Sequence, residues 1–429
     1  MKSNFSRRQF LRQTALGAAG TFFIARSGFA KVSPNEKLNI GAIGVAGRGG
    51  DDLHEVASEN IVAICDVDTH NLGAAAKKFP GAKTYYDFRR LVDRNDLDAI
   101  VVGTPDHVHA VQAAAALRSG RHVYCEKPLT RTISEARLIT DLARKHKRVT
   151  QIGTQIHAGG NYRRAVEIVR SGVIGNVTEV HVWVGATYGG KDMPKEFPPE
   201  PLHLHYDLWL GPVPFVPYHP QWVPFAWRNW WAFGGGSLAD FGCHFMDLPF
   251  WALDLRYPLS AEVVDGPPVH PDSTPPWLIV RYEFPARGVQ PPLNLIWYHG
   301  GKKPAELRED LRDKWGSGVL FIGQHGQLLA DYGRHMLLPE KQFEGWVRPR
   351  PSIADSIGHH KEWIEACKTG GKTTCNFDYS GPLTEAALLG NVAYRCGCRI
   401  DWDPKKLRAR NCADADQFIQ HKYREGWRL

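Results

Sequence analysis

The sequence predicts an α/β protein with two parts: an N-terminal doubly wound parallel sheet, and a C-terminal α+β domain with a large, mainly antiparallel sheet. Between about residues 36 and 155, short apolar runs alternate with helical patterns, as parallel strands joined by crossover helices require. A glycine-rich loop follows the first of these runs. Beyond residue 155 the pattern changes to strands in which apolar and polar residues alternate. The 429 residues, 43% of them hydrophobic, are enough for two cores.

The first thirty residues are interpreted as an export signal. A twin arginine in the run SRRQFL (residues 6–11) precedes a weakly apolar stretch and small residues that end at Ala30. This order is typical of a twin-arginine signal peptide, here residues 1–30, cleaved after Ala30. The apolar stretch is too short for a stable membrane anchor, which needs about 20 residues. We therefore expect the twin-arginine machinery as a partner and a periplasmic or extracellular location.

The formal net charge of +8 does not indicate a nucleic-acid partner. Much of this charge lies in the signal segment, which contains no acidic residue, and the rest of the chain has no run of lysine or arginine. Binding to a phosphate backbone requires a basic stripe. The basic residues of the signal segment are Lys2, Arg7, Arg8, Arg12 and Arg26.

Five strands and five intervening helices are predicted in the N-terminal domain, which we place at residues 36–155. Apolar runs of strand length occupy residues 38–43, 61–65, 99–102, 122–124 and 149–152. Helical patterns occupy residues 50–57, 72–78, 87–94, 108–119 and 134–147. Because a helix separates each strand from the next, we expect a doubly wound sheet.

The second domain is placed at residues 156–429. A helix is predicted at residues 162–171, and strands at 177–184, 278–284, 293–298 and 318–322. Two further helices are predicted at 359–368 and 382–395. Eight cysteines are scattered along the chain, and the first three, Cys65, Cys125 and Cys243, lie in apolar runs where buried thiols are expected. Cys396 and Cys398 lack a second ligand pair at zinc spacing, so no structural metal is expected.

A phosphate-binding loop is predicted directly after the first strand. Residues 44–49 read GVAGRG, close to the G-x-G-x-x-G pattern whose small residues let backbone N–H groups approach a pyrophosphate at a helix N-terminus. Gly44 and Gly49 occupy the outer positions. Ala46 replaces the central glycine, and Gly47 supplies part of the lost clearance.

Asp66 indicates which dinucleotide would bind. It ends the second strand, 22 residues after Gly44, where a carboxylate can accept the hydroxyls of the adenosine ribose. A carboxylate repels a 2′-phosphate, so NAD is favoured over NADP. Arg48 leaves NADP open, because a guanidinium there could bind that phosphate. The alternative without a dinucleotide is a flavodoxin-like domain with a tight turn and a solvated Asp66.

Two more strand ends point to the same crevice, residues 103–107 (GTPDH) and 124–128 (YCEKP). With the glycine loop and Asp66, they resemble the Gfo/Idh/MocA family of oxidoreductases, which includes glucose-fructose oxidoreductase and inositol dehydrogenase. The resemblance covers nearly all of the chain after the signal, and Glu-Lys-Pro is its most specific motif. It implies a Rossmann domain that binds NAD and a homo-oligomer. The cofactor-binding residues it implies, beside the glycine loop, Arg48 and Asp66, are Thr104, Pro105, His107, Glu126, Lys127 and Gln155.

The same resemblance implies a catalytic set of Lys127, Asp240 and His244. In the family, the lysine of Glu-Lys-Pro reaches nicotinamide and substrate, and a D-x-x-x-H pair completes the site. Residues four apart share one helical face, and Ser237 is a plausible N-cap for such a helix. His244 is the candidate base, Lys127 would stabilise charge on the reacting oxygen, and Asp240 would hold the substrate or His244. A metal bound by Asp240, His244 and Asp247 lacks a recognised signature, so no metal is expected.

An aromatic, proline-rich stretch at residues 206–233 is interpreted as part of a sugar or polyol site. Rigid aromatic faces can stack on a sugar ring; the alternative is that most of these rings simply pack the loop onto the domain or a partner subunit. The candidate substrate-binding residues are His157, Tyr162, Tyr188, Trp227, Arg228 and His244.

An exported dehydrogenase meets little free NAD. We therefore expect either a tightly held nicotinamide that is reduced by one sugar and reoxidised by another, or a redox-neutral glycosidase or lyase that oxidises C3 transiently. A sugar-binding protein without catalytic activity is the third possibility, against which the intact Lys127, Asp240 and His244 argue.

Overall fold

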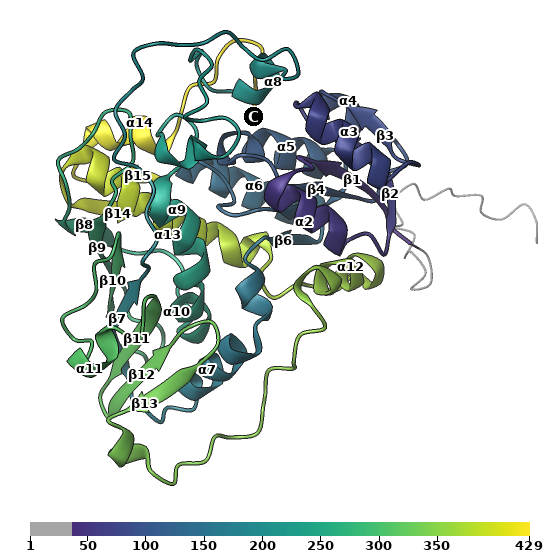
Figure 1. The fold of residues 1–429 in the computed structure, drawn as a ribbon. Coiled ribbons are helices and arrows are strands. Elements are labelled where there is room, and N and C mark those ends of the chain that lie inside the picture. The colour runs from purple at the N-terminus through teal and green to yellow at the C-terminus, as the bar shows by residue number, and fades with distance from the viewer. Residues whose placement is uncertain (1–36) are drawn as a thin grey trace, which may run out of the picture.

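Residues 37–429 are described by the computed structural model, and their N-terminal part forms a parallel sheet of six strands (Figure 1). These strands are β1 (Asn39–Ile43), β2 (Asn60–Cys65), β3 (Lys83–Tyr85), β4 (Ala99–Val102), β5 (His122–Cys125) and β6 (Thr150–Ile152). Their order is β3-β2-β1-β4-β5-β6, and all neighbours pair in parallel. The order reverses between β1 and β4, which opens a crevice at the carboxyl ends of these strands. The predicted fold class is confirmed; the predicted signal peptide lies outside the described residues.

Helices join the strands of this sheet and cover both of its faces. They are α2 (Gly47–Glu55), α3 (Thr69–Lys78), α4 (Phe88–Val92), α5 (Asp106–Arg118) and α6 (Ile133–His146). Asp68, Asp87 and Thr132 begin α3, α4 and α6 by accepting hydrogen bonds from backbone N–H groups of the first turn. The sequence predicted five strands. The additional strand, β3, is three residues long and mostly exposed, so it has no apolar run that could reveal it.

A helix from late in the chain completes the core of the first domain. Helix α12 (His359–Thr369) is reached through residues 344–358, which run without helix or strand along the edge of the molecule (Figure 1). Its Trp363, Ile364 and Cys367 are buried in one cluster with Leu38 and Tyr124. Part of the predicted second domain therefore folds onto the first.

The second domain contains a mixed sheet of nine strands in the order β13-β12-β11-β7-β10-β9-β8-β14-β15. The β7–β10 pair is parallel and the other pairs are antiparallel. The strands are β7 (Val177–Trp183), β8 (Ser260–Asp265), β9 (Leu278–Phe284), β10 (Leu293–His299), β11 (Gly318–Gly323), β12 (Gly326–Ala330), β13 (His335–Leu338), β14 (Ile400–Asp403) and β15 (Arg408–Ala409). The mainly antiparallel sheet was predicted; five of its strands, β8 and β12 to β15, were not.

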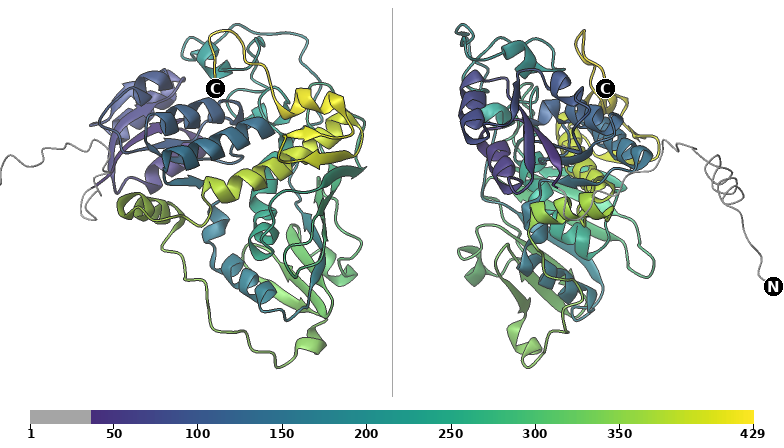
Figure 2. Two further views of the ribbon diagram at one scale, coloured as in Figure 1. Left: turned by 180° about the vertical axis from the view of Figure 1, so that it is seen from behind. Right: turned by 90° about the vertical axis from the view of Figure 1, so that its right-hand side faces the viewer.

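Helices cover one face of this sheet and connect it to the first domain. They are α7 (Gly160–Arg170), α9 (Gly236–Phe245), α10 (Asp247–Ala252) and α13 (Phe377–Cys396). Helix α13 packs on α6 of the first domain and on α9 of the second, and runs between the two sheets (Figure 2). On the opposite face, the segment containing α11 (Glu309–Arg312) buries Leu311 and Trp315 against the sheet. No helix among residues 37–429 is both long and apolar enough to cross a membrane.

The aromatic stretch forms a small core of its own beside the crevice. It contains α8 (Tyr206–Leu210) and a single turn of 3-10 helix, Ala226–Asn229. Trp209, Trp222 and Trp230 are buried in one cluster there, whereas Phe215 and Phe225 are exposed. Most of these rings therefore pack the loop, which was the alternative interpretation. Cys65, Cys125 and Cys243 are buried free thiols, as predicted.

Candidate active site

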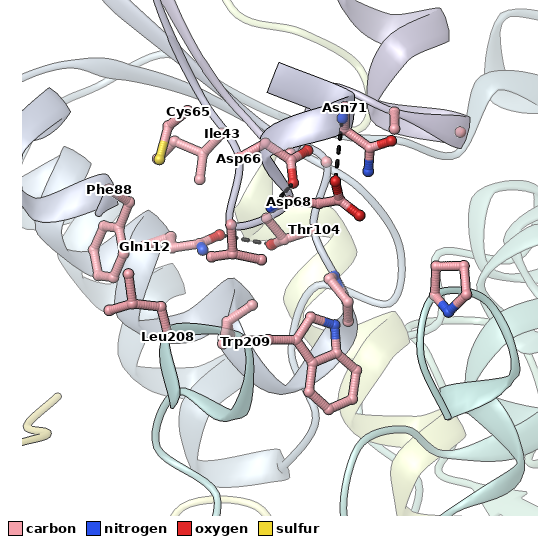
Figure 3. A pocket seen from close by; sticks show the side chains of 18 of the residues that line it. Ile43, Cys65, Asp66, Asp68, Asn71, Phe88, Thr104, Gln112, Leu208 and Trp209 are labelled. Atoms are coloured by element: carbon pink, nitrogen blue, oxygen red, sulfur yellow. Dashed lines mark hydrogen bonds between the residues drawn. The ribbon is translucent and has the colours of Figure 1, made fainter. Parts of the chain in front are cut away.

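A deep cleft lies at the carboxyl ends of β1, β2, β4 and β5, between the first domain and the aromatic loop. Figure 3 shows Asp66, Thr104 and Gln112 of the first domain opposite Leu208 and Trp209 of the loop. Gly44, Ala46, Gly47, Arg48, Pro105, Glu126, Lys127, Trp227 and Arg228 also line it. The structure thus brings together, in one cleft, most of the residues predicted to bind the cofactor.

Close backbone packing explains the glycines of the loop between β1 and α2. A Cβ atom on Gly49 would lie 2.3 Å from the carbonyl oxygen of Gly44, and one on Gly103 would lie 2.4 Å from the Cα of Gly49. Gly44 itself has a φ of +80°. Ala46 is the N-cap of α2, makes no side-chain cap, and is exposed to the cleft with Gly47. The first turn of α2 contains no acidic residue, so its N–H groups favour an anion.

Asp66 is held at the end of β2 by backbone donors. Its Oδ2 accepts a hydrogen bond from the Val45 N–H at 3.0 Å, and its Oδ1 accepts one from the Asp68 N–H at 2.9 Å. Burial raises the pKa of Asp66 above its ordinary value. The remaining lone pairs of the carboxylate can accept ribose hydroxyls.

Arg48 points to the other end of the crevice. Its Nη2 donates to Asp52 at 2.9 Å and its Nε donates to Glu126 at 3.3 Å. Glu126 follows β5, which lies three strands from β2, a separation on the order of 14 Å. The Arg48 guanidinium is thus engaged by two carboxylates on the Glu126 side of the crevice. This arrangement weakens the argument from Arg48 for NADP.

Glu126 is the centre of a buried network. Its Oε1 accepts a hydrogen bond from Gln155 Nε2 at 2.7 Å as well as the one from Arg48. Burial and the neighbouring Asp52 carboxylate raise the pKa of Glu126 to about 7. This network fixes the loop from which Lys127 extends. Gln155 is thus placed beside Glu126 and is not among the residues lining the cleft.

His107 does not line the cleft, in contrast to its predicted role with the cofactor. Its ring is buried, and Nε2 lies 2.7 Å from the carbonyl oxygen of Trp209. Burial lowers the pKa of His107 to about 3, so the neutral ring ties the aromatic loop to α5. Thr104, three residues earlier, does line the cleft and donates to Gln112 at 2.6 Å.

Lys127 and Asp240 form a buried ion pair between the two domains. Arg228 lies on the same carboxylate, with its Nε 3.4 Å from Asp240 Oδ1. Burial raises the pKa of Asp240, but the charges of Lys127 and Arg228 outweigh it and hold the pKa below the ordinary value. Burial likewise opposes the charge on Lys127, and Asp240 and Glu126 outweigh it, so its pKa is raised. Both groups are charged at neutral pH.

His244 lies one turn after Asp240 on α9. Burial, and then the nearby Lys127 charge, lower the pKa of His244 to about 3. The imidazole is therefore neutral at neutral pH. Its Nδ1 is buried without a hydrogen-bond partner in the described part of the chain.

Asp106 joins this centre and was not identified from the sequence. It lies in the first turn of α5, is buried, and its Oδ1 has no hydrogen-bond partner among the described residues. Burial raises the pKa of Asp106 well above its ordinary value, and the Arg228 charge offsets this only in part. A protonated Asp106 can donate a hydrogen bond. The sequence did not identify Asp106 as a site residue, because an acidic residue in the first turn of a helix is common.

Two of the predicted substrate residues lie beside the ion pair. Tyr188 is half-buried, stacks on Phe241 with ring centroids 5.8 Å apart, and has its backbone N–H bonded to Ser237 Oγ at 2.8 Å. Ser237 therefore anchors Tyr188, and the N-cap of α9 is Gly235. The Arg228 guanidinium lies 4.0 Å from the centre of the Trp227 ring, and both residues line the cleft.

His157 and Tyr162, also predicted to bind substrate, are fully buried away from the cleft. His157 Nδ1 lies 2.9 Å from Asp247 Oδ1, and its ring stacks on Trp251 at 4.0 Å. The Tyr162 hydroxyl donates to the His244 carbonyl oxygen at 3.4 Å. Both residues pack against α9 or α10. Asp247 thus pairs with His157, and Asp240 pairs with Lys127.

Comparisons with known proteins match both domains. The sequence model described as "Oxidoreductase family, NAD-binding Rossmann fold" matches residues 38–154, and that described as "Oxidoreductase family, C-terminal alpha/beta domain" matches residues 161–293. The inositol 2-dehydrogenase of Salmonella typhimurium (strain LT2) is 30% identical over 172 residues, 39% of this chain and 50% of that protein. A glycosyl hydrolase family 109 protein of Solibacter usitatus is 30% identical over 194 residues, 40% of this chain and 44% of that protein. The chain spans about half the length of these curated relatives.

Solved structures share the fold over most of the chain. GenD2 from gentamicin A biosynthesis, in complex with NAD, has a TM-score of 0.60 and 19% identity, and the match covers 86% of this chain and 97% of GenD2. Levoglucosan dehydrogenase, in complex with NADH and L-sorbose, has a TM-score of 0.56 and 17% identity. That match covers 85% of this chain and 99% of the levoglucosan dehydrogenase chain. At these identities the likeness supports the fold alone.

Proposed function

The chain belongs to the Gfo/Idh/MocA oxidoreductase family, with that family's NAD-binding Rossmann domain at its N-terminus, and from this we propose that it is an exported enzyme that oxidises a hydroxyl of a sugar or polyol with a tightly held NAD. The observation that carries the proposal is the Lys127–Asp240 ion pair, whose Lys127 lines the cleft, beside a neutral His244.

The residues of the cleft fit NAD. Backbone contacts among Gly44, Gly49 and Gly103 leave no room for a side chain, and the unpaired N–H groups of the first turn of α2 suit a pyrophosphate. Asp66 suits the hydroxyls of an unphosphorylated ribose, and Arg48 is engaged at the other end of the crevice. A bound NAD would supply the nicotinamide carbon that takes the hydrogen and two electrons from the substrate.

The surrounding side chains suit the proton transfer of that reaction. Oxidation of an alcohol releases a hydroxyl proton, and neutral His244 is the group able to accept it. The Lys127 ammonium would stabilise negative charge on the reacting oxygen. Asp240, held by both Lys127 and Arg228, positions the ammonium.

The polar groups beside the ion pair suit a sugar or polyol. The Tyr188 hydroxyl and Arg228 offer donors for its hydroxyl groups, whereas the Trp227 ring is buried and covered by Arg228.

A direct test is single turnover. The purified protein, loaded with NAD, is mixed with a panel of sugars and polyols, and the near-ultraviolet absorbance of reduced nicotinamide is followed. The proposal predicts reduction by at least one member of the panel in the wild type and none in Lys127→Met at equal NAD content. Reduction that is unchanged by Lys127→Met would remove Lys127 from the mechanism.

A redox-neutral glycosidase is the second candidate, and the similarity to the family 109 glycosyl hydrolase supports it. Such an enzyme needs a second acid or base near the substrate. Tyr188 is the candidate, because burial and then the Asp240 charge raise its pKa, which places the ring beside the ion pair; His157 is buried with Asp247 instead. Glycoside cleavage without accumulation of reduced NAD, abolished by Tyr188→Phe, would favour this candidate.

Export rests on the twin-arginine motif at residues 6–11. Arg7→Lys combined with Arg8→Lys should retain the protein in the cytoplasm, as measured by cell fractionation. Export that is unaffected by the double change would contradict a twin-arginine route.

A further inference from the structure

The last residues of the chain return from the second domain to the cleft of the first. After α14 (Asp416–Ile419) the chain reaches the space between α4 and α8, where Figure 1 marks its end. The Tyr423 hydroxyl donates to Glu135 on α6 at 2.5 Å. Arg424 Nε donates to the carbonyl oxygen of Gly211 at 2.6 Å. The backbone N–H of Arg424 donates to the carbonyl oxygen of Pro212 at 3.1 Å. Residues 423–429, here called the tail, are therefore docked by specific contacts.

Trp427 of this tail is part of the cleft wall. Its ring faces Phe88, with centroids 6.1 Å apart and planes at 27°, and the Arg89 guanidinium lies 5.1 Å from its centre. Val108 and Leu208 line the same end of the cleft. This end is an apolar slot that adjoins Asp66.

Helix α8 forms the other part of this wall. The loop before it is joined to the end of β2, because the Thr69 N–H donates to the His203 carbonyl at 2.8 Å and the His205 N–H donates to the Val67 carbonyl at 2.9 Å. After the helix, Gly211 has a φ of +54°, and a Cβ there would lie 2.4 Å from Val108 Cγ1. The wall is thus pressed against the first domain on both sides of α8.

Arg424 connects the tail to α8. Besides the bond to Gly211, its guanidinium donates to the backbone carbonyl of Asp207 at 2.6 Å and pairs with the carboxylate of the same residue. The tail and α8 therefore close the slot as one unit, here called the clamp (α8 with residues 423–429).

We infer that the clamp holds the adenine base of the dinucleotide, with Trp427 as its aromatic face. The inference rests on the proposed function, and follows from the position of the slot: a ribose bound to Asp66 places its base in the apolar space between Phe88, Val108 and the clamp. A flat aromatic surface is what a nucleobase stacks on. Release of the base then requires the tail to leave, so the clamp slows exchange of the cofactor.

The rate of NAD dissociation from the full-length protein measures this effect. The protein is loaded with NAD, and release is followed after dilution into excess ADP-ribose. Loss of a stacking face is expected to speed release about tenfold to a hundredfold in Trp427→Ala. The rate of NAD dissociation from Trp427→Phe should be close to that of the wild type. Arg428 is an exposed residue of the same segment, and Arg428→Ala should release NAD at the wild-type rate.

The two halves of the dinucleotide provide a second readout that is independent of turnover. With nucleotide-free protein in a calorimeter, Trp427→Ala should weaken ADP-ribose by the same factor and leave nicotinamide mononucleotide unchanged. Equal dissociation rates in wild type and Trp427→Ala, with NAD bound by both, would overturn the clamp and leave the proposed function intact. A wild type that binds neither NAD nor ADP-ribose would overturn both.

Discussion

Lys127 on the loop after β5 and Asp240 on α9 form an ion pair across the two domains, although 113 positions of sequence separate them. The pair lies where the cleft of the first domain meets the helices of the second. It has little exposure to solvent, so each charge depends on the other. The relative placement of the domains therefore determines whether the Lys127 ammonium, the proposed catalytic group, is held by Asp240.

Asp240→Asn is expected to reduce the rate of the chemical step by about 10²–10³. The change removes the charge that positions Lys127, and leaving one member of a buried pair alone is destabilising by about 3–5 kcal/mol. Single-turnover reduction of NAD and urea unfolding measure the two effects. Asp254→Asn, which alters an exposed carboxylate paired with Arg170, is the control and should change neither. An Asp240→Asn enzyme of normal rate would show that the pair has no part in catalysis.

His244→Asn is expected to lower the rate about 10²–10⁴-fold, because the proton acceptor is lost. With a pKa of about 3, caused first by burial and then by Lys127, the imidazole is protonated only in strong acid. The base is therefore in its active form throughout the range above that value. The pH profile of kcat/KM for the wild type should show no acid limb caused by His244 near the ordinary histidine value of about 6.5; a limb near 7 from Glu126 would persist in the variant. Such a limb, absent in His244→Asn, would contradict the burial argument.

Asp66→Asn should lower the ratio of the affinity for NAD to the affinity for NADP. The carboxylate accepts ribose hydroxyls and repels a 2′-phosphate, so its neutralisation weakens NAD binding about tenfold and strengthens NADP binding. Titration with both dinucleotides measures this ratio. Arg48→Gln is the matched test, because Arg48 is engaged by Asp52 and Glu126. A loss of affinity for NADP alone in Arg48→Gln would restore Arg48 as a phosphate ligand.

Gly49→Ala should prevent dinucleotide binding and lower the melting temperature. The new Cβ would meet the Gly44 carbonyl oxygen at 2.3 Å, a contact that only movement of the backbone can relieve. Gly73→Ala is the control, because Gly73 lies exposed within α3 with no atom within 4 Å of an added Cβ. It should raise the free energy of unfolding by about 0.5–1 kcal/mol. Normal NAD binding in Gly49→Ala would show that the loop tolerates a side chain.

The first sheet could be predicted because its strands are continuous apolar runs, as the fully buried β4 illustrates. The runs end at Asp66, Gly103 and Glu126, and parallel strands bring those ends to one edge. The packing of α12 on the first domain could not be predicted, because the apolar pattern of a helix does not indicate which of two sheets the helix will cover. Four of the strands missed in the second sheet have five residues or fewer, and β15 has only two. The fifth, β8, has six residues, but its last four are half-buried or exposed, so it has no continuous apolar run.

The family resemblance of Glu-Lys-Pro and D-x-x-x-H indicated that Lys127 and Asp240 belong to one site, and the structure places these two residues in contact; their catalytic role stays a prediction. Three features of the site were not local. Asp106 is buried beside Arg228 only in the folded chain, and Trp427 reaches the cleft through a tail whose sequence has no recognisable pattern. His107 was predicted to line the cleft, but its ring is buried against the Trp209 carbonyl. His157 and Tyr162 follow β6 closely, yet their side chains are buried against Asp247 and the His244 carbonyl and do not line the cleft.

The most direct test of the account is the identity of the dinucleotide in the protein as purified. Mature protein is isolated without added nucleotide, denatured, and the released small molecules are identified and counted by mass spectrometry. The account predicts close to one NAD or NADH per chain, with NADP at most a minor fraction. An empty protein that also fails to bind either dinucleotide on titration would contradict the oxidoreductase function and leave a sugar-binding role.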